Sequence, residues 1–264
     1  MQLKDLDKYI IEDIESDDHP SDFIKRDKYF GLILRLPIKE DKVKIKSYAF
    51  LVQNGEVYQY NRDKKDIELL GSIDMLQKLL EPLVEKLIRD IKQYHINVDK
   101  LEENLYEGRV SNTFMQDWLQ YKKDVSLINR LMFHASIVME LFISHLKREY
   151  NNKFNVEAFD DLHEEISRVR DLAKACVEKL DNLYDFYRAK VDEKMNKNVY
   201  YLTLLSGIFL PLTLATGFFG MNTGGLPFTD DSMGTWKVVA ISLVLEVIFF
   251  VPLILQNSRR IKKR

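Results

Sequence analysis

Glu246 is the residue whose position most strongly suggests chemistry, because it is the only charged residue in the apolar segment 238–255. A carboxyl group at membrane depth is costly, so it is expected either to carry a proton or to hydrogen-bond to a neighbouring group. The other polar groups of the apolar segments 199–219 and 238–255 are hydroxyls and backbone carbonyls, with the amides of Asn196 and Asn222 beside the first, since the cysteine and all five histidines lie elsewhere. Oxygen ligands suit Mg²⁺, whereas Zn²⁺ prefers thiolate and imidazole.

The composition argues against several classes of protein. The sequence contains no Gly-rich phosphate loop, no His-Glu-x-x-His, no nucleophile elbow and no Cys-x-x-Cys, so we expect no enzyme and no catalytic residue. Cys176 is the only cysteine, which excludes a disulfide framework and fits a reducing compartment. A net charge of −2 leaves no basic footprint for nucleic acid. The first residues are acidic and lack the apolar core of a signal peptide.

The charged residues are distributed very unevenly along the 264 residues. Of the 39 basic and 41 acidic residues only nine follow residue 197, and none lies between Lys197 and Asp230. Segment 199–219 has about 21 residues without a charge, and segment 238–255 has about 18 residues with Glu246 as its single charge, lengths that can cross about 30 Å of hydrocarbon. With the short loop between them, they predict a helical hairpin in a membrane; a buried hairpin of a soluble protein is the alternative.

The flanking charges predict the orientation of this hairpin. Arg259, Arg260 and the tail 262–264 follow the second span, and Lys194 and Lys197 precede the first, whereas the loop carries two aspartates. Positive charge is enriched on the cytoplasmic side. We therefore expect a multi-pass protein of the inner (plasma) membrane, surrounded by lipid, with both termini in the cytoplasm.

The first 70 residues predict strands, and helices follow. The run 29–38 is apolar and branched, and Asn54-Gly55 between two apolar arms signals a tight hairpin. Helical spacing then extends from a possible N-cap at Ser72 to Gly108, where Pro82 is a possible break, and again from about residue 111 to Tyr150.

Apolar residues recur at spacings of three and four from Phe159 to Val199, without a glycine or proline before Gly207. This stripe predicts a long helix, coiled-coil-like in its packing, that continues into the first span; a surface helix on a globular core is the alternative. Two spans per chain cannot enclose a polar pathway, so we infer a symmetric ring of identical chains with the first spans inside.

These observations give an α+β fold with long helices, a continuous stalk and first transmembrane helix, and a second transmembrane helix. The expected parts are an α/β cytoplasmic domain at 1–70, a cytoplasmic helical region at 71–153, a stalk helix at 154–198, a first span at 199–220, an outer loop at 221–236, a second span at 237–256 and a basic cytoplasmic tail at 257–264.

The sequence Gly220-Met221-Asn222 stands at the outer end of the first span, and Thr-Gly-Gly-Leu-Pro follows it. Together with the two spans and the basic tail, this motif resembles the CorA-type divalent-cation transporter family, and its continuation is similar to the ZntB branch. The resemblance implies a homopentamer with a central pore along the first spans and metal sites between the cytoplasmic domains.

The resemblance assigns roles to individual residues. It implies an outer-mouth selectivity ring at Asn222, with Gly220 allowing a sharp turn of the backbone next to Met221. The remaining lining positions that it implies are a polar inner ring at Asn196, apolar constrictions at Val199, Leu202 and Leu210, a hydroxyl at Thr213 and a carbonyl at Gly217. Without the family, Thr213 would be a threonine bonded to its own helix backbone and Asn196 a solvated residue.

Two further sets of residues follow from the comparison with the family pattern. An acidic residue of a regulatory site between subunits corresponds best to Asp161, with Asp160 beside it and Asp185 a weaker match; a solvated helix face is the alternative. Two positions depart from the pattern, namely Phe219, where tyrosine is usual, and Glu246.

The identity of the ion stays open at this level. The oxygen-only lining favours a route for hydrated divalent cations, with Mg²⁺ first and Zn²⁺, Co²⁺ and Ni²⁺ as alternatives, as substrates and as regulatory ligands. The ZntB-like loop favours Zn²⁺, with proton coupling through Glu246 as a further alternative. A membrane-anchored coiled-coil scaffold is the rival class, but it leaves the Gly-Met-Asn motif unexplained.

Overall fold

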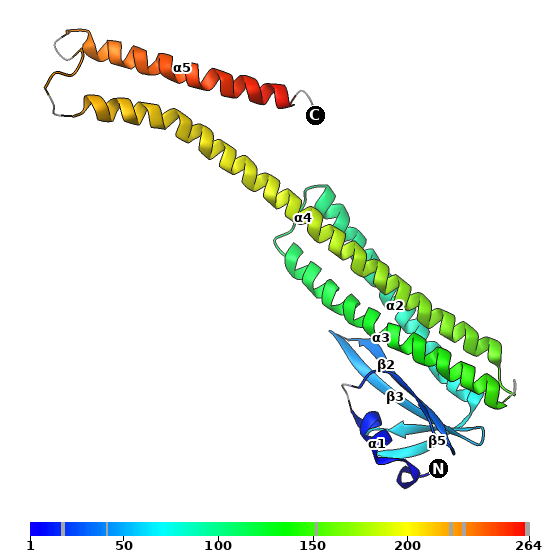
Figure 1. Cartoon of the computed structure of the whole chain (residues 1–264). Coiled ribbons are helices and arrows are strands. Elements are labelled where there is room, and N and C mark those ends of the chain that lie inside the picture. The colour runs from blue at the N-terminus through cyan, green and yellow to red at the C-terminus, as the bar shows by residue number, and fades with distance from the viewer. Residues whose placement is uncertain (17–18, 41, 151–152, 222–223, 229–230, 262–264) are drawn as a thin grey trace. The chain divides into compact units, whose positions relative to one another are not determined.

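The computed structural model describes residues 1–16, 19–40, 42–150, 153–221, 224–228 and 231–261; the side chains of residues 5, 245 and 249–261 lie outside the description. Contacts divide the chain into two units, Met1–Tyr187 and Arg188–Arg264, and one long helix contributes to both (Figure 1). The elements are η1 (Leu3–Asp5), α1 (Lys8–Glu15), β1 (Asp22–Lys25), β2 (Phe30–Lys39), β3 (Val43–Gln53), β4 (Glu56–Asn61), β5 (Asp66–Ser72), α2 (Ile73–Tyr106), α3 (Phe114–Tyr150), α4 (Val156–Phe219) and α5 (Gly234–Ile261).

The strands of unit 1 form one antiparallel sheet in the order β1-β2-β3-β4-β5. β2 is apolar apart from Arg35 and Lys39, and both of its faces are covered. Leu32 and Leu34 point into the core shared with the long helices, and Ile33 between them packs against α1. Alternate residues of β2 therefore pack into two different cores, which explains why the strand is almost continuously apolar in the sequence.

The predicted hairpin joins β3 to β4. Asn54 and Gly55 have φ angles of 54° and 82°, as a type I′ turn requires, and Gln53 pairs with Glu56 across it. Pro82 does not break α2, which runs from Ile73 to Tyr106. Both Pro82 and Lys78, whose carbonyl loses its usual donor, are exposed, so water can satisfy that carbonyl.

The helices α2 and α3 and the first part of α4 form the larger core of unit 1. Eight members of the predicted stripe are buried: Phe159, Leu162, Ile166, Val169, Ala173, Cys176, Leu180 and Leu183. Side chains of the other two helices also bond to the α4 backbone. Trp118 Nε1 donates to the Leu180 carbonyl at 2.7 Å, and a ring nitrogen of His95 lies 2.8 Å from the Leu172 carbonyl.

His145 of α3 lies between the helices and the sheet, 6% exposed, with its ring 4.6 Å from that of Phe30. Burial, and secondarily the charge of Lys25, lower the pKa of His145 from its ordinary value of 6.5. The neutral ring therefore contributes stability that is complete above pH 6.5. That stability decreases as the pH falls toward the folded-state pKa, because only the unfolded chain takes up the proton.

We therefore expect the free energy of unfolding of unit 1 to fall on acidification below pH 6.5, and less steeply in His145→Leu. Urea titrations of the full chain in detergent measure it, with Trp118 fluorescence as the probe in a Trp236→Phe background. His134→Leu, at a less buried position of the same helix, is the matched control. If the free energy of unfolding of His145→Leu depends on pH as steeply as that of the wild type, His145 is not the group responsible.

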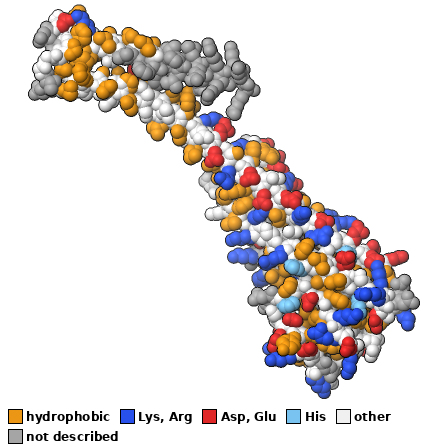
Figure 2. All heavy atoms as spheres, in the orientation of Figure 1, with side chains coloured by type: hydrophobic (Ala, Val, Ile, Leu, Met, Phe, Trp, Pro, Cys, Tyr) orange, Lys and Arg blue, Asp and Glu red, His pale blue; other side chains and the backbone are white. Residues whose placement is uncertain are grey.

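Unit 2 consists of the second part of α4, the loop and α5, which form a helical hairpin (Figure 1). Among the described residues, α3 and α4 are long and apolar enough to cross a membrane. The apolar window of α3 is half buried, as in a core helix of a folded domain, whereas that of α4 is not buried at all. Figure 2 shows charged side chains scattered over unit 1 and a mainly apolar described surface on unit 2.

Candidate functional site

The second part of α4 has one face that no other part of the described chain covers. Val199, Leu202 and Leu210 are 55%, 64% and 69% exposed. At about 100° per residue, these three positions and Asn196, Thr213 and Gly217 fall within roughly one third of the helix circumference. The residues expected to line a pore therefore share one unpartnered helix face.

A groove of about 510 Å³ follows the C-terminal half of this face. Its walls are Leu210, Thr213, Leu214, Gly217, Phe218 and Met221. Four of these were predicted site residues, whereas Asn196, Val199 and Leu202 lie farther along α4, outside the groove. Leu214 and Phe218 were missed, although their spacings of four and eight residues from Leu210 could have identified them.

The polar groups of the groove are oxygens. The Thr213 hydroxyl donates to the Phe209 carbonyl at 2.7 Å, as expected for a threonine bonded to its own helix, and keeps its lone pairs as acceptors. A Cβ built on Gly217 meets nothing within 4 Å, so the glycine leaves that wall open. Such a surface can accept hydrogen bonds from the waters of a hydrated cation.

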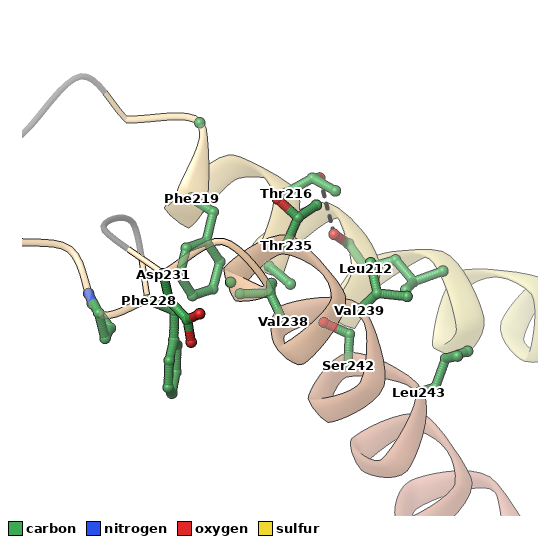
Figure 3. A pocket seen from close by; sticks show the side chains of 14 residues that line it. Leu212, Thr216, Phe219, Phe228, Asp231, Thr235, Val238, Val239, Ser242 and Leu243 are labelled. Atoms are coloured by element: carbon green, nitrogen blue, oxygen red, sulfur yellow. Dashed lines mark hydrogen bonds between the residues drawn. The ribbon is translucent and has the colours of Figure 1, made fainter.

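The opposite face of α4 contacts α5 around a cavity of about 570 Å³ (Figure 3). On the α4 side it is lined by Leu212, Ala215, Thr216 and Phe219 of the helix and by Gly220, which follows it. From the loop and α5 the lining residues are Pro227, Phe228, Asp231, Gly234, Thr235, Val238, Val239, Ser242 and Leu243. No residue lines both the groove and the cavity, so one side of α4 holds the hairpin together and the other stays free.

Two glycines shape the ends of the helices in unit 2. The Gly220 amide donates to the Thr216 carbonyl at 2.9 Å, and a Cβ on Gly220 would lie 2.9 Å from that same oxygen. A Cβ on Gly234, the buried first residue of α5, would collide with the Phe228 carbonyl. Gly234 was not predicted, and its place at the start of the second apolar run was the available signal. Asn222 lies outside the described residues.

The acidic candidates of unit 1 lie apart along α4. Asp160 accepts hydrogen bonds from Lys147 Nζ, at 2.8 Å, on both carboxylate oxygens. Asp161 and Asp185 are exposed and have no ion-pair partner in the part of the chain that the structure describes. They are separated by roughly 36 Å of helix. Within the described residues of one chain, no group of three His, Cys, Asp or Glu side chains could hold a metal ion.

Glu246 lies on the side of α5 that faces α4. It follows Ser242 by four residues and Val239 by seven, and both of those residues line the cavity. Its side chain is partly buried. The expected proton-linked residue therefore faces the interior of the hairpin, on the opposite side of α4 from the expected pore-lining face.

Comparisons with known proteins extend over most of the chain. A family model described as "CorA-like Mg2+ transporter protein" matches residues 2–256. The cobalt/magnesium transport protein CorA of Methanocaldococcus jannaschii is 24% identical over 249 residues, covering 86% of this chain and 76% of that protein. The zinc transport protein ZntB of Vibrio parahaemolyticus is 28% identical over 170 residues, covering 64% of this chain and 52% of that protein.

The solved structure of the complete Methanocaldococcus jannaschii CorA magnesium transporter has the same fold. The TM-score is 0.72 at 20% identity, and the match covers 94% of this chain and 83% of the other. The expected fold class, an α+β domain with long helices and a continuous stalk and first span, is therefore confirmed, and its sheet is antiparallel. With a family match from residue 2 to residue 256, the chain belongs to the CorA-like Mg²⁺ transporter family.

Proposed function

We propose that this chain conducts Mg²⁺ into the cell through a pore on the axis of a homopentamer. Membership of the family makes it a divalent-cation transporter of the membrane and not an enzyme, and implies a homo-oligomer. The proposal of a pore on a common axis rests on the uncovered face of α4, an exposed apolar face whose polar groups are oxygens. Identical faces turned toward one axis would give a closed lining that a single chain lacks.

In this proposal the spans are residues 199–220 and 237–256. Both termini are cytoplasmic, so the Gly-Met-Asn motif lies at the outer mouth. Five Asn222 amides there would bind the cation through its hydration waters, because Mg²⁺ gives up water reluctantly. Thr213 and Gly217 would supply oxygens below them, Leu210, Leu202 and Val199 apolar constrictions, and Asn196 an inner polar ring. The inside-negative potential, about 2.3 kcal/mol per charge per 100 mV, drives entry.

Zinc is the second candidate substrate, and a specific observation favours it. The ZntB proteins of Vibrio parahaemolyticus and of Yersinia species are among the relatives, and the loop Thr-Gly-Gly-Leu-Pro is similar to that branch. Against it, the groove offers no thiolate or imidazole to replace the waters of Zn²⁺.

A competition assay tests the proposed substrate. The full chain is reconstituted in liposomes with an inside-negative potential, and Mg²⁺ entry is measured while Zn²⁺, Co²⁺ or Ni²⁺ is added outside. We expect Mg²⁺ entry that excess Co²⁺ or Ni²⁺ reduces through competition. Zn²⁺ entry with no Mg²⁺ entry would replace magnesium by zinc, and no entry of any divalent cation would refute transport.

We further propose that Asp161 contributes to a regulatory cation site between neighbouring cytoplasmic domains. Asp161 is exposed, whereas the neighbouring Asp160 is neutralised by Lys147. A bound cation would reduce the repulsion between acidic domains and hold the ring closed, so a chelator on the cytoplasmic side should increase Mg²⁺ entry. Asp161→Asn should abolish the increase in Mg²⁺ entry on adding the chelator. Asp63→Asn, a change at an exposed turn residue, should keep that increase. Equal flux with and without the chelator contradicts this role.

A further inference from the structure

Glu246 presents a carboxyl group to the interior of the hairpin in unit 2. Its Oε1 atom is buried and has no hydrogen-bond partner among the residues that the structure describes. Spacings of four, seven and eleven residues relate it to Ser242, Val239 and Thr235, all of which line the cavity between α4 and α5. Glu246 thus continues the cavity-lining side of α5 by one further turn.

No cation near Glu246 neutralises this carboxyl group within the described part of unit 2. On α5, Lys237 lies about 14 Å earlier along the helix and is paired with Asp231 at the loop. On α4, no Lys, Arg, His, Asp or Glu follows Lys197, and the titratable groups after it are the phenols of Tyr200 and Tyr201. An intramembrane carboxylate without a counter-charge is costly, so a proton is the partner that this environment leaves.

The cavity connects the loop end of the hairpin to the turn next to Glu246. At one end it is lined by the Asp231 carboxylate, and hydroxyls of Thr235 and Ser242 follow along α5 (Figure 3). Its volume of about 570 Å³ exceeds many times the ~30 Å³ that one water occupies in the liquid. Polar groups spaced along a cavity of this size can hold waters that relay a proton.

We propose that Glu246 is a proton-binding site reached from the loop side through the α4–α5 cavity, and that cation flux depends on its protonation. The second half of this statement rests on the proposed transport function. The groove and the cavity lie on opposite sides of α4, so the proton and the divalent cation take separate routes. Protonation of Glu246 affects the pore-lining face indirectly, by changing how α5 packs against α4.

Carbodiimide labelling tests proton binding without any measurement of transport. Dicyclohexylcarbodiimide adds to protonated carboxyl groups in apolar surroundings, and peptide mass spectrometry locates the adduct in the full chain in liposomes. We expect labelling of Glu246 that slows by up to about tenfold per pH unit as the outside is made alkaline. Glu246→Gln should lose this adduct, and Ser242→Leu, which fills the inner end of the cavity, should slow it. No adduct at Glu246, or a rate independent of outside pH, overturns the proposal.

The pH dependence of flux tests the second half. We expect wild-type Mg²⁺ entry to change with outside pH, Glu246→Gln to flatten the profile, and Glu246→Asp to restore part of it. Glu103→Gln, at an exposed position of α2, is the matched control and should keep the wild-type profile. If all variants share one profile, the proton link is wrong although transport stands. If wild type carries no cation, the proposed function fails, and labelling alone decides the proton site.

Discussion

Replacing Asn222 with alanine is expected to reduce Mg²⁺ uptake to nearly the level of protein-free liposomes. In the proposed ring the change would remove every residue-222 amide from the outer mouth at once, because all subunits would carry it. A hydrogen bond to a charged partner contributes about 1.5–3 kcal/mol, and about 1.4 kcal/mol corresponds to a factor of ten in binding. The loss of several such contacts to the hydrated ion should therefore abolish its capture.

The matched control for this substitution is Asn198→Ala. Asn198 is another asparagine of the chain; it is exposed and lies about 120° around α4 from the line of Leu210, away from the proposed lining face. Fluorescent indicators trapped in the liposomes measure the initial rate of entry for both variants. Wild-type rates in Asn222→Ala would show that the motif does not select the ion, and would favour the scaffold alternative.

Replacing Leu210 with serine is expected to change the flux in the opposite direction. Leu210 projects from the uncovered face of α4 and borders the groove, so a ring of such leucines would form a dry constriction. A leucine side chain accounts for about 1.5–3 kcal/mol of apolar transfer free energy, and a change of about 1.4 kcal/mol is tenfold. We expect Mg²⁺ entry under closed conditions to rise by at least about tenfold.

Leu212→Ser is the control for this second prediction. It makes the same change on the same helix, but Leu212 lines the cavity against α5 on the opposite side. The control can lower the thermal stability of the hairpin, and it should leave basal leak at the wild-type level. Equal leak in the two variants would show that the groove side of α4 does not line the route.

The opposite signs of these two predictions separate conduction from general damage. A misfolded ring loses flux whichever residue is changed, whereas an opened constriction gains it. Measuring both variants at equal protein content, checked by size-exclusion chromatography in detergent, therefore tests the proposed lining face as a whole.

Much of the fold could be predicted where the sequence has a strong local signal. Asn54-Gly55 could be recognised because both residues must take positive φ, and the stripe from Phe159 to Leu183 because it repeats over many turns. β1 and β5 were not predicted individually. They are the outer strands of the sheet, and β1 has only Phe23 and Ile24 as apolar residues, so neither carries a full alternating pattern.

Local signals misled where the surroundings decide the outcome. Pro82 suggested a break in α2, yet its exposed position lets water replace the lost donor. Ser72 precedes the first residue of α2 as expected, but its side chain makes no capping hydrogen bond. The neighbouring Asp74 carboxylate instead accepts a hydrogen bond from the backbone N–H of Asn155 at 2.8 Å, a contact between distant parts of the sequence that no local pattern contains.

The site was predictable only in part. The resemblance identified Thr213 and Gly217, and helical spacing could have added Leu214 and Phe218, which line the same groove. The burial of the Glu246 carboxyl oxygen could not be derived, because it depends on how α5 packs against α4. Selectivity is a property of the assembled ring, so the roles of the lining residues stay predictions.

The separation of the two sides of α4 has a practical consequence for engineering. Because the groove and the cavity share no residue, a combinatorial library restricted to Leu210, Thr213 and Gly217 leaves the contacts with α5 intact. Each substitution in such a library is present in every subunit of the homo-oligomer. Genetic selection on different metals could then retune the preference of the protein without redesigning its scaffold.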